Sequence, residues 1–144
     1  MRRKGNTKAE RELSGALGVL RRRELEAVSR YLSASAFCAK EYAELSEMFE
    51  GFAHEHAENF KVMESACRDI SAMGVRSVRA GAGSSPFRNA TECVESLARL
   101  ERDGRLEYER VYILDESGRL DADVQKILRA FGKRLSILEN IMRT

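Results

Sequence analysis

The chain has 144 residues, of which 43% are hydrophobic and 33% are charged, and its formal net charge at pH 7 is only +2. This composition is typical of one soluble globular domain and argues against a disordered chain, while the small net charge provides no overall basic field for nucleic acid. No apolar run approaches the roughly 18 residues that span a bilayer, and the N-terminus lacks an apolar signal core, so we expect a cytoplasmic protein without a membrane partner.

Residues 1–7 are predicted to form a basic, flexible N-terminal segment, followed by one domain over residues 8–144. A second basic run, RRR, occupies residues 21–23. Neither run has aromatic side chains between its basic residues, so a nucleic-acid partner is not expected. In the domain, Leu, Ala, Glu and Arg dominate while Val, Ile and Thr are sparse, which favours helices over strands.

Apolar residues recur at steps of three, four or seven, which predicts amphipathic helices over about 8–38 and about 41–73. The next stretch, GVRSVRAGAGSSPF at 74–87, is rich in Gly and Ser and holds the only proline. A third helix is predicted to begin after a cap at Asn89 or Thr91.

A turn, ESGRLDAD, separates the third helix from a fourth, with Gly118 suited to a helix C-terminus and Asp121 to an N-cap. Two short connections and one long central one predict an all-α four-helix bundle with a long crossover between helices 2 and 3.

Three polar residues fall on the apolar faces of these helices: Glu24 in the first, His56 in the second and Glu101 in the third. His54 lies about 200° from His56 around the helix and is expected to face water. The fourth helix is expected to present only hydrocarbon at this level, from Phe131 onward.

Burying an unpaired carboxylate costs several kcal/mol, so Glu24 and Glu101 need a compensating partner. One interpretation is a metal ion held by their oxygens and the His56 imidazole. Another is a metal-free cluster, in which protonated His56 bridges the two acids and Tyr31 or Tyr108 donates a hydrogen bond. A third is that rotated helices leave the carboxylates exposed.

The two halves of the chain share a design, because RELEAVSRY holds Glu24 and Tyr31 seven residues apart, and LERDGRLEY holds Glu101 and Tyr108 at the same spacing. This paired design resembles the ferritin-like superfamily, especially rubrerythrin and bacterioferritin, over roughly residues 10 to 142. The best local matches are ELEAVSRYL and AELSEMFEGFA. The resemblance implies two iron ions held by one Glu from each of two helices and a Glu-x-x-His pair from each of the others.

Glu24 and Glu101 match the two single carboxylates of that pattern, but the second-helix pair is broken. In one register His56 replaces the family's Glu and Asn59 replaces its His; in another, His56 is the His and Ala53 replaces the Glu.

The fourth-helix pair is replaced by Leu135 and Leu138, and Gly104 stands where rubrerythrins carry an additional acid. Too few hard ligands remain for two irons.

The resemblance therefore implies a remodelled site that binds one transition-metal ion (iron, zinc or manganese) or none and lacks standard di-iron oxidase activity. Its candidate ligands are Glu24, His56 and Glu101, with Asn59, Tyr31 and Tyr108 as neighbours. No catalytic residue is assigned.

Two other functions stay open. One is a metal-free helical module for protein–protein interaction. The other is an intact di-iron peroxidase or ferroxidase, a metal-dependent oxidoreductase in which Glu55, Glu58 or His54 swings inward at a helix irregularity near Gly51. Four-helix proteins of this size often pair, so a homo-oligomer such as a dimer is expected.

Overall fold

The computed structural model describes residues 8–70 and 87–143, and the regular structure in this part of the chain consists of four α-helices. Their bounds are α1 Lys8–Cys38, α2 Ala43–Ile70, α3 Ala90–Leu114 and α4 Asp121–Arg143. The predicted all-helical class is confirmed. The predicted N-terminal segment, and the predicted long connection except for its last residue, lie outside the described residues.

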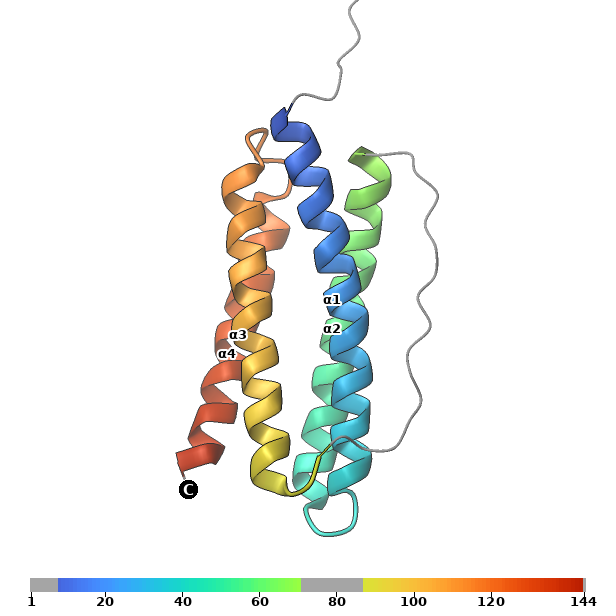
Figure 1. Cartoon of the computed structure of the whole chain (residues 1–144), viewed down its shortest axis with the longest axis vertical. Coiled ribbons are helices and arrows are strands. Elements are labelled where there is room, and N and C mark those ends of the chain that lie inside the picture. The colour runs from blue at the N-terminus through green and yellow to red at the C-terminus, as the bar shows by residue number, and fades with distance from the viewer. Residues whose placement is uncertain (1–7, 71–86, 144) are drawn as a thin grey trace, which may run out of the picture.

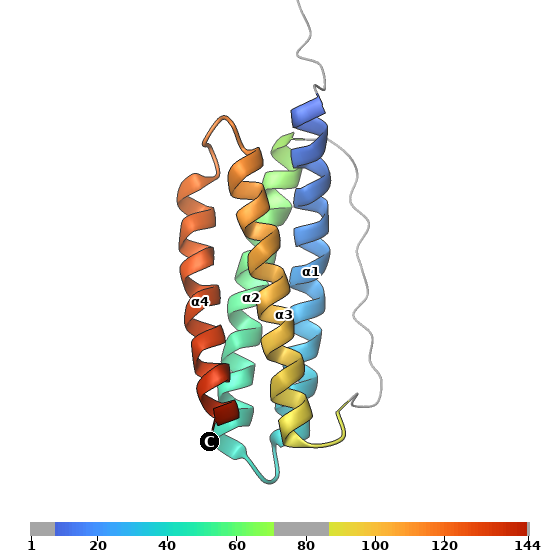
Figure 2. The same ribbon diagram turned by 60° about the vertical axis from the view of Figure 1, so that its left-hand side comes forward.

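The four helices lie side by side along one long axis (Figure 1). α1 and α4 run in one direction along the bundle, and α2 and α3 run in the other, so α2 ends and α3 begins at opposite ends (Figures 1 and 2). α1 packs against α2 and α3, and α3 packs against α4, while α2 and α4 contact each other least. Residues in the middle of all four helices are thereby brought to one level of the core.

The N-terminus of α3 is fixed by Asn89, whose side-chain oxygen accepts a hydrogen bond from the Glu92 backbone N–H at 2.8 Å. This is the first of the two caps predicted from the sequence. The Glu92 carboxylate in turn accepts a hydrogen bond from the backbone N–H of Arg88, the residue before the cap. The first bond satisfies an N–H group that the helix start would otherwise leave unpaired, and the second ties the residue before the cap to the first turn.

The turn between α3 and α4 is organised differently from the prediction. α3 ends before Asp115, whose carboxylate accepts from the Ser117 hydroxyl at 2.7 Å and from the Leu120 backbone N–H at 2.9 Å. Gly118 does take the left-handed conformation (φ 73°), but within the turn. Asp121 is already helical, because the Leu120 carbonyl accepts the first helical bond.

Two apolar clusters form the core and are separated along the bundle. One gathers the C-terminal half of α1, the start of α2, the start of α3 and the end of α4; its buried residues are Tyr31, Ala34, Cys38, Phe49, Phe52, Ala53, Phe87, Cys93, Val94, Leu97, Ala98, Leu135 and Leu138. The other gathers the opposite ends of the same helices; its buried residues are Leu13, Ala16, Leu17, Leu20, Met63, Ala66, Tyr108, Val111, Leu120, Val124, Ile127 and Phe131. Between the two clusters lies a level of the core that is not apolar.

Candidate functional site: a charged layer in the bundle core

Each helix contributes one charged or titratable side chain between the two apolar clusters: Glu24 from α1, His56 from α2, Glu101 from α3 and Arg134 from α4. We call these four residues the polar layer. None of them exposes more than 2% of its surface. The three residues singled out in the sequence are therefore buried at one level, and the interpretation with solvent-exposed carboxylates is wrong.

His56 lies between the two glutamates. Its Nδ1 is 2.5 Å from Glu24 Oε1, and its Nε2 is 2.8 Å from Glu101 Oε2. A carboxylate only accepts hydrogen bonds, so an imidazole that donates to two of them must carry a proton on each nitrogen. The geometry is that of an imidazolium bridging two acids. Asn59, one turn further along α2, donates to Glu24 Oε2 at 3.3 Å.

Two tyrosines complete the hydrogen bonding of the acids, each from the other helix. The Tyr108 hydroxyl of α3 donates to Glu24 of α1 at 2.5 Å, and the Tyr31 hydroxyl of α1 donates to Glu101 of α3. The seven-residue spacing between Glu and Tyr in each half thus produces a reciprocal exchange between α1 and α3. Tyr31 also stacks on the His56 ring, with centroids 5.4 Å apart.

Arg134 corrects the expectation that α4 offers only hydrocarbon here. Its Nε donates to both Glu101 oxygens at 3.0 Å, and its Nη1 donates to Glu55 Oε1 at 2.7 Å. The guanidinium lies over the Phe131 ring, 4.6 Å from the centroid. Leu135 and Leu138 are buried in the apolar cluster that also contains Cys38 and Phe49, and they do not face the acids.

The sequence did contain a signal for Arg134. It stands three residues after Phe131 and four before Leu138, which places it on the apolar stripe of α4. A long charged side chain on a helix is usually expected to face solvent, and for this reason the burial of Arg134 was not predicted. Counting charges would have helped, because two buried carboxylates and one imidazolium leave one negative charge uncompensated.

The surroundings shift the proton affinities of the layer. Burial lowers the pKa of His56, but the hydrogen bonds and charges of Glu101 and Glu24 outweigh it, so the pKa lies above the ordinary value. Burial raises the pKa of Glu101, but His56, Arg134 and Tyr31 together bring it below the ordinary value.

Burial and the nearby carboxylates raise the pKa values of Tyr31 and Tyr108 well above the usual range, so both remain hydrogen-bond donors. With His56 protonated, two carboxylates face two cations and the polar layer carries no net charge.

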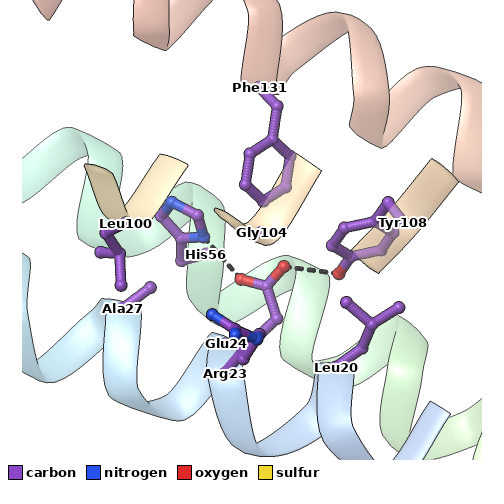
Figure 3. Close-up of a pocket in the computed structure, with 9 residues that line it drawn as sticks. All are labelled: Leu20, Arg23, Glu24, Ala27, His56, Leu100, Gly104, Tyr108 and Phe131. Carbon is purple, nitrogen blue, oxygen red and sulfur yellow. Dashed lines mark hydrogen bonds and ion pairs between the residues drawn. The ribbon is translucent and has the colours of Figure 1, made fainter. Parts of the chain in front are cut away.

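A small cavity of about 10 Å³ adjoins the layer between Glu24, His56 and Tyr108 (Figure 3), and this is about the space of one water molecule. Phe131 fills the space beside Gly104 so closely that a Cβ on Gly104 would stand 2.7 Å from its ring. The space that a side chain at position 104 would need is thus occupied by the edge of an aromatic ring.

The ligand atoms of the polar layer are already engaged in hydrogen bonds and ion pairs, which disfavours a metal ion here. An ion on the imidazole would have to displace a carboxylate from one of its nitrogens, and an ion on Glu101 would stand against the Arg134 guanidinium. In residues 8–70 and 87–143, no group of three or more His, Cys, Asp or Glu side chains is arranged to hold an ion.

The substitute ligands considered from the sequence do not reach the two acids. His54 and Glu58 are exposed, and Glu58 pairs with Lys61 at 3.3 Å. Glu55 is half exposed and contacts the layer only through Arg134. α2 continues through Gly51 as regular α-helix.

Within the described ranges, no helix combines the length and the apolar character that crossing a membrane requires. No protein-family model matches the chain, and a search of curated proteins finds no significant match.

Proposed function

We propose that this protein is a ferritin-like four-helix bundle whose di-iron site has been replaced by a metal-free ion-pair layer, and that it serves as a protein–protein interaction module that assembles as a homo-oligomer. The observation that carries the proposal is charge compensation: protonated His56 and Arg134 stand against Glu24 and Glu101 at hydrogen-bond distance. The cationic positions that metal ions would take are filled by the protein's own side chains.

The chemistry of the layer supports a structural role. The Glu24 and Glu101 oxygens accept hydrogen bonds from Tyr, His, Asn or Arg donors, and the raised pKa values of the two phenols keep them protonated near neutral pH. A buried polar layer of this kind is known in other systems to fix helix register and partner choice, at some cost in stability. We infer that here it fixes the level at which all four helices meet.

The ferritin-like assignment within this proposal draws on the sequence resemblance and on the antiparallel order of the helices. α2 and α3 run in the same direction, so α2 ends and α3 begins at opposite ends of the bundle, and this helix order is the one found in ferritin-like folds with one crossover.

Metal analysis tests the proposal directly. The protein is produced in media supplemented with iron, manganese or zinc and purified without chelator, and its metal content is measured by elemental analysis. We expect far less than one ion per chain, no ferroxidase or peroxidase turnover, and a melting temperature that EDTA does not change. One or two ions per chain, with a melting temperature that falls on chelation, would overturn it.

A further inference from the structure

Two of the three cysteines meet inside the core, away from the polar layer. Cys38 is the last residue of α1, and Cys93 belongs to the first turn of α3, where its backbone N–H donates to the Asn89 carbonyl at 3.0 Å. Both are free thiols in the same apolar cluster, and each exposes 0% of its surface. Their side chains are hydrogen-bonded to each other, with the Cys93 thiol donating to the Cys38 sulfur.

The position of this pair in the bundle gives a bond between the two sulfurs a definite structural effect. α1 and α2 form one helical hairpin, and α3 and α4 form a second (Figures 1 and 2). α1 ends and α3 begins at the same end of the bundle. A disulfide between Cys38 and Cys93 therefore links the two hairpins and encloses residues 39–92, which include all of α2.

The local structure can accommodate such a bond. A disulfide shortens the separation of the two sulfurs from a hydrogen-bond contact to about 2.05 Å. Because α1 ends at Cys38, the terminal residue of that helix can take up most of the shift. Cys67 offers no competing partner, since it packs against the apolar cluster at the other end of the bundle.

We propose that Cys38 and Cys93 form a reversible disulfide that links the two helical hairpins covalently, with a low-molecular-weight disulfide as the oxidant. The Cys38 thiolate attacks one sulfur of the oxidant and expels the other half as a thiolate. The Cys93 thiolate then attacks the Cys38 sulfur of this mixed disulfide and expels the second half. Two cysteines are oxidised, the small disulfide is reduced to two thiols, and the two protons lost by the cysteines end on those thiols.

The proton affinities of the pair set the order and the rate of these steps. Burial raises the pKa of both thiols, and that of Cys93 reaches about 12. The hydrogen bond from Cys93 opposes the rise of the Cys38 pKa, so Cys38 ionises first. Since the thiolate is the nucleophile, the bond is expected to form slowly at neutral pH and faster at alkaline pH. In a reducing compartment both residues remain thiols until small disulfides accumulate.

Oxidation of the full chain tests whether the bond forms. The reduced protein is incubated with oxidised glutathione at mildly alkaline pH, once under native conditions and once near its melting temperature, where access to the core no longer limits the reaction. Peptide mapping should show a Cys38–Cys93 link in either incubation, with Cys67 outside it, and dithiothreitol should reverse the link. Free thiols or mixed glutathione disulfides without this link in both incubations, or a link through Cys67, would overturn the proposal.

Thermal denaturation of the linked and the reduced protein tests the structural effect. Closing a loop of this length restricts the unfolded chain, so the linked protein should melt roughly 10 °C higher. Cys67→Ser is the matched control and should keep both the link and the rise, whereas Cys93→Ser should lose both. An equal or lower melting temperature in the linked parent, or a rise on oxidation that persists in Cys93→Ser, would contradict a covalent link between the hairpins.

Discussion

Arg134 and His56 act as the counter-ions of two buried carboxylates, those of Glu24 and Glu101. The layer holds because each acid receives several donors, since a buried ion pair by itself barely recovers the desolvation of its members. Tyr31 and Tyr108 supply the additional hydrogen bonds, each to the glutamate of the other helix. The arrangement is therefore expected to be sensitive to the loss of any one partner and tolerant of changes at its exposed rim.

Arg134→Met keeps much of the side-chain volume and removes the cation that faces Glu101. We expect the free energy of unfolding to fall by about 3–5 kcal/mol, because a buried carboxylate loses a charged partner. The control is Arg102→Met, which breaks the exposed pair with Glu139 and should cost no more than about 1 kcal/mol. Urea denaturation measures both, and equal losses in the two variants would argue against a charge role for Arg134.

The pH dependence of stability follows from the two shifted groups. Because the pKa of His56 is raised in the folded state, its contribution is complete below about pH 6.5 and is lost as pH rises through the folded value. Because the pKa of Glu101 is lowered, its contribution is present above about pH 4.3 and is lost as pH falls through the folded value.

We therefore expect the urea midpoint to be highest between these limits. In His56→Gln the alkaline decline should be weaker than in the parent, although the variant is less stable throughout. Parallel alkaline declines in the two proteins would show that His56 does not titrate there.

At the scale of single elements, α3 and α4 approach closely where Gly104 faces Phe131. Gly104→Ala would put a Cβ 2.7 Å from the ring and should destabilise the bundle by about 1–3 kcal/mol. Gly15 is an exposed helical glycine with open space around its Cβ position, so Gly15→Ala should stabilise by about 0.5–1 kcal/mol. Thermal denaturation that showed the same sign for both would mean that the contact with Phe131 is not close.

The cap of α3 gives a second test at this scale. Asn89→Ala removes the side-chain oxygen that bonds the Glu92 N–H and should cost about 1 kcal/mol, whereas Asn89→Ser should retain most of the stability. Chemical denaturation of the two variants distinguishes a cap from a residue that is merely exposed.

The sequence predicts a feature well where local helical periodicity determines it, and poorly where a contact with another part of the chain determines it. The bounds of α1 and the inward direction of Glu24, His56 and Glu101 follow from helical periodicity, which is a local property. The end of α3 does not, because the Asp115 side chain organises the turn before Gly118 is reached. The position of Arg134 on the apolar stripe of α4 was readable from that helix, but its burial was not, since burying a guanidinium is favourable only once Glu101 of another helix is known to face it.

At the scale of the whole molecule, the polar layer separates the core of the bundle into two apolar clusters. Sliding any helix along the bundle axis would bring a charged residue of the layer against hydrocarbon, at a cost of several kcal/mol. Register and charge balance are thus two consequences of the same four residues. Both require that His56 carry two protons and no metal.

Nitrogen NMR of His56 measures this state most directly, with protein labelled on the imidazole nitrogens and spectra recorded at neutral pH before and after addition of excess zinc or ferrous iron. We predict that both His56 nitrogens are protonated and that neither signal shifts on addition of metal, while exposed His54 serves as an internal reference. A His56 ring with one unprotonated nitrogen, whose signal moves as one equivalent of metal binds, would contradict the metal-free ion-pair layer.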